Sequence, residues 1–356
     1  MSILLTGLTG AVGSYLAPVL AQKTEIFCLV RKGKSRVKNG ELWGIPEAQI
    51  IEGDITENGC GLNENDLLAL KKKGINQIIH SAASVKFDEK LTENVWQTNY
   101  QGTQRILELA HTLNVKAFHY ISTAYASTQR NPYEASKAEA ERLVKASNIP
   151  HSIYRLGIVV GHSETGYIKS FDGIYGYLAG LYRMAQKEMR QQNMRGNHIE
   201  LPICLECSST STLNLVPVDW VVNMLIGLIE VPPINQTFSI THPNPPQAKI
   251  AMEQSLNLLG ISGIKYYEPK MSPPEHTERH WQVIQKIICK HLERYKPYIT
   301  EEKKFCIQST QEVLGKKYIN PPLITKGFLS VLLNYANKNH FGQQNAFADG
   351  SLGMVH

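Results

Sequence analysis

Short apolar runs alternate with amphipathic segments along the first half of the chain. The runs that are predicted to form strands are SILLT, EIFCLV, AQIIEGD, NQIIHSAA, AFHYIST and HSIYRLGIVV. Amphipathic helices are predicted between several of these runs, at residues 65–73, 95–111 and 133–146. Nearly continuous strands of Ile, Leu and Val separated by helices are typical of a parallel sheet that is covered on both faces. The pattern therefore predicts an α/β fold with a doubly wound parallel sheet, whose ligands bind at the carboxyl ends of the strands.

The alternation stops after Val160, where a Tyr- and Met-rich helical stretch, DGIYGYLAGLYRMAQKEMRQQ, follows. It returns in LNLVPVDWVVNMLIGLIE and TFSIT, and proline clusters separate the later helical segments. We therefore expect a Rossmann-type domain, which holds the parallel sheet, formed by residues 1–161 and 213–242. A smaller, mostly helical substrate-binding lobe is expected from residues 162–212 and 243–356.

Composition and charge narrow the class of protein. The chain has 356 residues, of which 42% are hydrophobic and 19% are charged, as in a soluble globular protein. A net charge of +6 is too small to indicate a nucleic-acid partner, but it suits anionic ligands or an acidic protein. The six Cys lack the spacing of a disulfide framework or a metal site, so we expect reduced thiols in a cytoplasmic protein and no metal. Neither a signal peptide nor a transmembrane segment is predicted, because glycines and Asp219 interrupt the apolar stretches.

A glycine pattern marks the turn after the first predicted strand. Gly7, Gly10 and Gly13 follow SILLT directly and precede a helical segment. Glycines at this spacing allow a tight turn and a close approach of a pyrophosphate, while the helix N-terminus faces the phosphates. The sequence therefore predicts a dinucleotide site, the alternative being a glycine-rich turn without a ligand.

The end of the second predicted strand is basic. After Glu25 the next acidic residue is Glu41, and the stretch RKGKSRVK between them includes Arg31 and Arg36. A carboxylate at this place would repel a 2′-phosphate, whereas Arg can hold it by charge-assisted hydrogen bonds. NADP(H) is therefore the expected cofactor. The alternative is that these basic residues face solvent and bind no phosphate, which would leave the choice between NAD and NADP open.

The stretch ISTAYASTQRNPYEASK carries candidate carbonyl chemistry. Tyr133 and Lys137 are four residues apart and so share one helix face. Lowering the pKa of a Tyr from about 10 to about 7 requires roughly 4 kcal/mol. One cation at about 4 Å supplies roughly that much at an effective dielectric constant near 20. Thr123, at the end of the fifth predicted strand, can donate a hydrogen bond to a carbonyl oxygen as charge develops there. An ordinary surface helix is the alternative for the Tyr-Lys pair taken alone.

Several motifs occur together in a fixed order over about residues 1–240. They are the glycine pattern, GDIT at 53–56, HSAA at 80–83, NYQGT at 99–103, Ser122–Thr123 and YEASK. Together they resemble the extended short-chain dehydrogenase/reductase superfamily. Within it, HSAASVKFDEKLTENVWQTNYQGT, YISTAYA, RLGIVVGHSETG and LVPVDWVVN are most similar to fatty acyl-CoA reductases and to thioester-reductase domains of carrier-protein synthases, the male-sterility type. LERYKPYITEEKKFCIQSTQEVL resembles the C-terminal lobe of fatty acyl-CoA reductases.

The resemblance implies roles for particular residues. The implied catalytic residues are Thr123, Tyr133, Lys137 and Asn99, with Lys137 also binding the nicotinamide ribose and Asn99 supporting it through a water. Besides Tyr133 and Lys137, the implied cofactor-binding residues are Gly7, Thr9, Gly10, Val12, Gly13, Arg31, Arg36, Asp54, Ile55, Ala82, Ala83, Leu156 and Ile158.

Two features of this sequence help to decide which branch of the superfamily it resembles. Ala124–Tyr125 stand where sugar-nucleotide dehydratases have Asp-Glu, so dehydration lacks its acid and base. The connection from Thr123 to Tyr133 is short, which suggests a more open channel that suits an extended thioester. The helix around 173–189 is a candidate for lining an acyl tunnel, or it simply packs on the sheet.

These observations favour an NADPH-dependent reductase that converts an acyl thioester, on CoA or on an acyl or peptidyl carrier protein, to an aldehyde and, with a second hydride, to an alcohol. The thioester is expected to be made elsewhere, because the chain contains no adenylation or carrier domain. One alternative is an NAD(P)-dependent epimerase or reductase of a nucleotide sugar, sterol or small ketone. The other is a non-catalytic NADPH-binding interaction protein, against which the intact Thr123, Tyr133 and Lys137 count.

The basic loop after the second strand yields a prediction about the cofactor. Arg31→Ala should weaken NADPH binding by about tenfold or more and change NADH binding little, because only NADPH carries the 2′-phosphate. Titration calorimetry with both cofactors on wild type and variant measures this difference. Equal affinity of the wild-type protein for NADPH and NADH would contradict the prediction.

Overall fold

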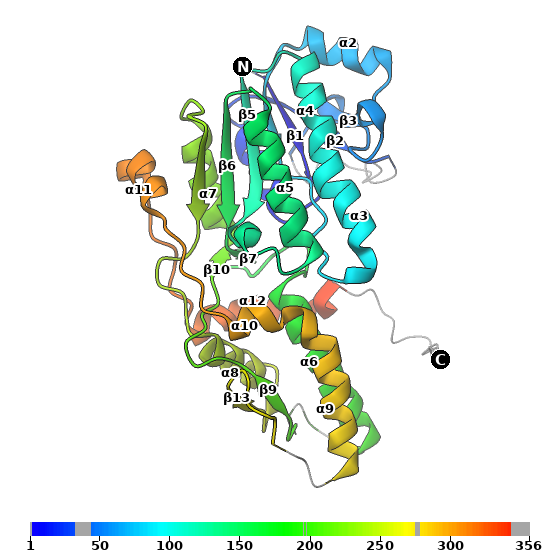
Figure 1. The fold of residues 1–356 in the computed structure, drawn as a ribbon, viewed down its shortest axis with the longest axis vertical. Coiled ribbons are helices and arrows are strands. Elements are labelled where there is room, and N and C mark those ends of the chain that lie inside the picture. Colours follow the sequence, from blue (N-terminus) through cyan, green and yellow to red (C-terminus); the bar gives the residue numbers. More distant parts are fainter. Residues whose placement is uncertain (1, 33–43, 195, 197, 275–277, 343–356) are drawn as a thin grey trace.

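A computed structural model describes residues 2–32, 44–194, 196, 198–274 and 278–342 (Figure 1). Its centre is a sheet of seven parallel strands in the order β11-β6-β5-β4-β1-β2-β3. These strands are β1 (Ser2–Thr6), β2 (Glu25–Val30), β3 (Ile50–Glu52), β4 (Ile75–His80), β5 (Ala117–Thr123), β6 (His151–Leu156) and β11 (Gln236–Ile240). The predicted doubly wound parallel sheet is confirmed.

Helices cover both faces of this sheet. One apolar cluster joins the sheet to α1 (Gly13–Ala21) and α7 (Val218–Ile229). A second cluster on the opposite face includes residues of α2 (Glu64–Lys72), α4 (Gly102–Thr112) and α5 (Pro132–Ala146). The helix that was predicted at 95–111 has an irregular start, with α3 (Thr92–Trp96) and a π-helical turn (Gln97–Gln101) before α4.

The strand that was predicted at 151–160 is divided at Gly157, which corrects the expectation of one continuous strand. A Cβ atom at Gly157 would lie 2.5 Å from Oδ1 of Asn214, so the chain bends there against its neighbour. Beyond the bend, β7 (Ile158–Val160) leaves the main sheet and pairs in parallel with β10 (Leu215–Pro217).

Residues between β7 and β10, together with most of the chain after β11, form a second body below the sheet in Figure 1. Its helices share one apolar cluster and are α6 (Ile174–Gln191), α8 (Ala248–Leu258), α9 (Arg279–Leu292) and α12 (Lys326–Lys338). Short parallel pairs join β8 (Ile199–Glu200) to β12 (Ile261–Ser262), and β9 (Cys204–Glu206) to β13 (Lys265–Tyr267). We call this body the lobe, and the exact domain boundaries given above stay a prediction.

Two short helices connect the lobe with the sheet. α10 (Lys296–Thr300) lies between the two bodies, whereas α11 (Gln308–Leu314) packs on α7 and β11. Oγ1 of Thr310 donates a hydrogen bond to the carbonyl oxygen of Ser239 at 2.8 Å. The late part of the chain therefore contributes to both bodies.

The longest apolar stretch forms β10 and α7 and is buried against the sheet, as the sequence predicts. Among the described helices, none combines the length and the apolar character that crossing a membrane requires. Within the same residues, no group of three or more His, Cys, Asp and Glu is placed to hold a metal ion.

Candidate active site

The glycine turn lies where the strand order of the sheet reverses, between β1 and β4. Gly7 has a φ of +83°, and a Cβ atom there would lie 2.6 Å from the backbone N of Ala82. A Cβ atom at Gly13 would lie 2.1 Å from the carbonyl oxygen of Gly7. Only glycine fits at either place, and the resulting tight turn aims the N-terminus of α1 at the carboxyl edge of the sheet. Dinucleotides bind at such a switch point in doubly wound folds, so the residues present fit this class of cofactor.

A cavity of ≈ 290 Å³ opens at this edge, and we call it the central cavity. Eight of the predicted site residues line it, namely Gly10, Val12, Ala83, Thr123, Tyr133, Lys137, Leu156 and Ile158. Motifs far apart in the sequence therefore meet in one place, because they follow the ends of neighbouring parallel strands.

The other predicted cofactor residues lie outside the lining of the central cavity. Gly7, Thr9, Gly13 and Ala82 belong to the turns beside it. Oδ1 of Asp54 accepts hydrogen bonds from the backbone N and Oγ1 of Thr56, both at 2.8 Å. Ile55 is buried against Gly102. Arg31 is exposed directly after β2, and Arg36 lies outside the described residues.

Thr123 and Tyr133 come together from the end of β5 and the start of α5. Asn131 caps α5 with its side-chain oxygen, which accepts a hydrogen bond from the backbone N of Glu134 at 3.0 Å. This cap and Pro132 at the first helical position fix Tyr133 in the first turn. Burial raises the pKa of Tyr133 to about 12, and the hydrogen bond with the Thr123 side chain opposes this rise. The Tyr133 hydroxyl is therefore protonated near neutral pH and can act as a hydrogen-bond donor.

Lys137 lies in the same helix as Tyr133 and lines the same cavity. Its Nζ donates a hydrogen bond to the carbonyl oxygen of Ile121 at 2.6 Å and lies 4.1 Å from the centre of the Tyr120 ring. Burial lowers the pKa of Lys137 to about 7. The prediction that Lys137 brings the pKa of Tyr133 near 7 is wrong in this structure. The loss of hydration around each group shifts its pKa toward the neutral form.

Asn99 lies in the π-helical turn between α3 and α4, a type of distortion that is frequent at functional sites. Its Oδ1 accepts a hydrogen bond from the backbone N of Ser84 at 2.7 Å. Its Nδ2 donates to the carbonyl oxygen of Ser84 and to Oγ of Ser136, both at 3.0 Å. Asn99 thus joins the loop after β4 to the residue before Lys137, and its implied catalytic role stays a prediction.

Several residues that line the central cavity have no role predicted from the sequence. Among them are Phe87, Asp172, Tyr295, Tyr298 and Ile299. The rings of Phe87 and Tyr298 stack at a centroid distance of 5.4 Å, and Tyr295 meets Phe87 edge-on at 5.8 Å. We call Phe87, Tyr295 and Tyr298 the aromatic wall. The one available signal was the stretch LERYKPYIT, whose resemblance to the lobe of acyl reductases came without a functional role.

The expectation of a more open channel stays a prediction. Residues of α10 and of the turn before it line the central cavity beside the short connection that precedes Tyr133. Tyr125 lies in the same connection, is buried, and contacts the Tyr298 ring edge-on at 5.0 Å.

The proposed tunnel helix is α6, and only its first turns line the central cavity, through Ile174 and Tyr177. Tyr175, Leu178 and Leu181 are buried in the apolar cluster of the lobe instead. Most of α6 therefore packs in the lobe core.

Together, the parallel sheet, the glycine turn at its switch point and the Thr, Tyr and Lys side chains in one cavity define an oxidoreductase of the extended short-chain dehydrogenase/reductase type with a NAD-binding domain. A family model described as "Male sterility protein" matches residues 5–132 and 128–225. These matches cover more than half of the chain, which therefore belongs to this family.

Known relatives of the chain include reductases and multidomain synthases. It is 27% identical over 280 residues to a linear gramicidin synthase of Brevibacillus parabrevis, covering 68% of this chain and 5% of that protein. It is 28% identical over 246 residues to fatty acyl-CoA reductase wat of Drosophila melanogaster, covering 50% of this chain and 47% of that protein. The chain thus spans less than half the length of either relative.

A solved structure is similar over nearly the whole chain. It is the terminal R domain from the myxalamid PKS-NRPS biosynthetic pathway, with a TM-score of 0.72 and 25% identity. The match covers 97% of this chain and 92% of that chain. The resemblance to acyl and thioester reductases that the motifs indicated is confirmed.

The buried Lys137 yields a prediction about stability. Its pKa is about 7 when folded and near 10.5 when unfolded, so protonated Lys137 opposes folding fully below pH 7 and progressively less as pH rises toward 10.5. Lys137→Met keeps most of the side-chain volume and removes the charge. It should raise the free energy of unfolding at pH 6 by on the order of 1–3 kcal/mol, with a smaller gain at pH 9.

Urea unfolding at both pH values measures this effect. Lys145→Met is the matched control, because Lys145 is exposed in the last turn of the same helix and should show no pH-dependent gain. A loss of stability of Lys137→Met at pH 6 would contradict the prediction.

Proposed function

We propose that this protein reduces an acyl thioester to an aldehyde with NADPH, using Thr123, Tyr133 and Lys137. The observation that carries the proposal is the meeting of Thr123, Tyr133 and Lys137 in one cavity whose remaining lining is mainly apolar. Membership of the male-sterility family and the similarity to a terminal R domain support the same reaction class.

The cofactor, when bound, supplies a hydride to the carbonyl carbon of the substrate. Thr123 and Tyr133 are then placed to donate hydrogen bonds to the carbonyl oxygen as negative charge develops on it. Because the pKa of Tyr133 is above neutrality, its hydroxyl carries the proton that the oxygen takes up. The product of this step is a hemithioacetal. Its carbon–sulfur bond then breaks as the hydroxyl returns its proton to Tyr133, and the departing thiolate takes a proton from solvent, which leaves the aldehyde and the free thiol. Lys137, protonated below about pH 7, is proposed to bind ribose hydroxyls, as the family resemblance implies.

The surroundings of the reacting groups favour an acyl chain over a sugar. A nucleotide sugar carries many hydroxyl groups, and a site that selects it must pair them with hydrogen-bonding side chains. Here the aromatic wall faces the cavity, and the Tyr298 hydroxyl is already engaged with Glu134 and Asn131. At the position of the dehydratase acid and base stand Ala124 and Tyr125, which are both buried.

A surface for an acidic carrier protein is part of the proposal. A second cavity of ≈ 230 Å³ lies between α6 and α9, and we call it the α6–α9 cavity. Arg183 and Lys187 line it together with apolar residues that include Leu181, Met184 and Ile287. Two further basic residues, Arg190 and Arg195, follow these along the chain and are candidates for the same surface. Arg190 already has an interaction within the chain, and Arg195 lies outside the described residues.

The reaction is tested by following NADPH oxidation with a panel of acyl-CoAs and aldehydes and identifying the products by mass spectrometry. Tyr133→Phe removes only the hydroxyl and should lower kcat by about 100-fold or more, while NADPH still binds. Leu20→Ile, in the core between α1 and the sheet, is a control for a mild structural change. Near-normal reduction by Tyr133→Phe would refute the acid role, and the absence of aldehyde or alcohol products from all thioesters would refute the reaction.

Carrier docking is tested by reversing two charges at the α6–α9 cavity. The double variant Arg183→Glu/Lys187→Glu should raise the apparent KM for an acyl-carrier thioester by about tenfold at low salt, because exposed charges mainly steer the encounter of two proteins. Reduction of a short free aldehyde should stay nearly unchanged. If the carrier substrate were equally unaffected at low ionic strength, a free CoA thioester would be the better substrate.

A further inference from the structure

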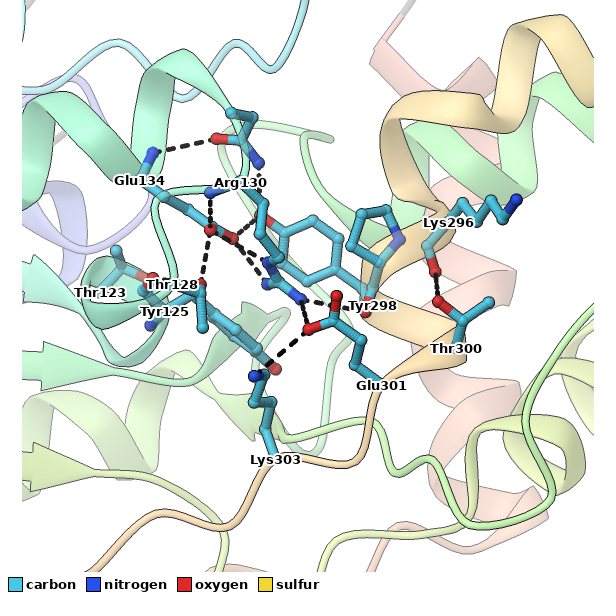
Figure 2. A network of polar contacts seen from close by, with 12 residues as sticks. Thr123, Tyr125, Thr128, Arg130, Glu134, Lys296, Tyr298, Thr300, Glu301 and Lys303 are labelled. Carbon is cyan, nitrogen blue, oxygen red and sulfur yellow. Dashed lines mark hydrogen bonds and ion pairs between the residues drawn. The ribbon is translucent and has the colours of Figure 1, made fainter. Parts of the chain in front are cut away.

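The lobe reaches back and contacts the short connection that precedes α5, as Figure 2 shows from close by. NH1 of Arg130 donates hydrogen bonds to the carbonyl oxygen of Pro297 at 3.0 Å and to the carboxylate of Glu301 at 3.1 Å. Nδ2 of Asn131 donates to the hydroxyl of Tyr298 at 3.0 Å. These hydrogen bonds join the connection before α5 to α10, which lies more than 160 positions later in the sequence.

A buried carboxylate lies at the centre of this contact. The Glu134 side chain is 0% exposed, and that of Arg130 is 11% exposed. Oε2 of Glu134 accepts hydrogen bonds from Oγ1 of Thr128 at 2.6 Å, and from the backbone N and Nε of Arg130 at 2.9 and 3.1 Å. Oε1 accepts from NH2 of Arg130 and from the hydroxyl of Tyr298, both at 2.7 Å. Five donors therefore satisfy a charge that would be costly to bury alone.

The same contact fixes the ring of Tyr298. The guanidinium carbon of Arg130 lies 4.5 Å from the centre of this ring, and Phe87 stacks on the ring at 5.4 Å. Phe87 in turn lies 5.8 Å from the ring of Tyr133. Because its hydroxyl is used by Glu134 and Asn131, Tyr298 contributes an aromatic surface to the central cavity that it lines.

α10 has only five residues, and a helix of this length is not stable by itself in water. Its place over the cavity must therefore come from contacts with the rest of the molecule. The buried contacts of Arg130 and Glu134 differ from the ion pair of Arg142 with Glu139 farther along α5, where the Arg142 side chain is 67% exposed. Such an exposed pair contributes little to position or stability.

We infer that Tyr298 is a specificity-determining residue of the central cavity and that Arg130 and Glu134 are positioning residues that hold its ring there. The Tyr298 ring is held at its hydroxyl and packs against Arg130 and Phe87. A ring held in this way limits the size of the acyl group that fits in the central cavity, whereas a flexible side chain could move aside. The specificity part rests on the proposed function, because it concerns the acyl group of the thioester. The positioning part rests on the contacts alone.

Specificity is tested with two thioesters that differ in bulk near the carbonyl, phenylacetyl-CoA and butyryl-CoA. Tyr298→Ala removes the ring and enlarges the central cavity beside Phe87, whose own ring contacts Tyr133. The ratio of kcat/KM for phenylacetyl-CoA over butyryl-CoA should rise by about tenfold, the size of discrimination that an apolar pocket can give. Arg142→Lys, on an exposed part of the same helix, should leave the ratio unchanged.

Positioning is tested by amide hydrogen exchange on the full-length protein. Arg130→Lys keeps the positive charge but loses the guanidinium group, whose several N–H donors bond Glu134, Pro297 and Glu301 at once. Glu134→Gln keeps the shape of the side chain but removes its negative charge. In both variants the amides of α10 should exchange about tenfold faster or more, while those of β1 and β4 stay as in the wild type. The substrate ratio should move in the same direction as in Tyr298→Ala, by about threefold.

Each outcome decides one part of the inference. Unchanged exchange in α10 of both variants overturns the positioning role, even where activity falls. An unchanged substrate ratio in Tyr298→Ala, with an active wild type, overturns the specificity role. If the wild-type protein reduces no thioester, the proposed function and the specificity role fail together, and the exchange measurement still decides whether Arg130 and Glu134 position α10.

Discussion

The arrangement of the site depends on the hydrogen bonds and the ion pair that the buried carboxylate of Glu134 forms. Burial opposes its charge, but hydrogen bonds from Arg130, Thr128 and Tyr298 hold the pKa of Glu134 below its ordinary value. Removing one partner of such a buried pair typically costs about 3–5 kcal/mol. Glu134 follows Tyr133 directly in the first turn of α5. The same charge network therefore contacts both the first turn of α5 and the residues of the lobe beside it.

The electrostatics of the site favour proton donation over proton removal. Burial raises the pKa of Tyr133 and lowers that of Lys137, so both groups tend toward their neutral forms. A neutral Tyr hydroxyl beside Thr123 is suited to meet a developing oxyanion, which is what reduction of a carbonyl requires. Burial of Lys137 lowers the stability of the fold at pH values near 7. Such a loss of stability is common at functional sites.

Local sequence signals predicted most of the sheet and the meeting of Thr123, Tyr133 and Lys137. The ends of parallel strands share one edge, and a four-residue spacing places two side chains on one helix face, so spacing was sufficient. Spacing could not predict the aromatic wall, because Phe87 and Tyr298 are brought together only by the packing of the lobe on the sheet. It also could not predict that Lys137 donates to the Ile121 carbonyl, since several rotamers fit the same helix position.

Helix α6 links the central cavity to the α6–α9 cavity. Tyr177, near its start, lines the first cavity, and residues from Gly180 to Lys187 line the second. The two linings therefore begin about three residues apart on this helix, which corresponds to about 5 Å along its axis. An acyl arm from a carrier protein docked at the α6–α9 cavity would have to pass the start of α6 to reach Tyr133. A rigid aromatic wall at the end of that path would act on the acyl group alone, so docking and acyl selection would be set by different residues.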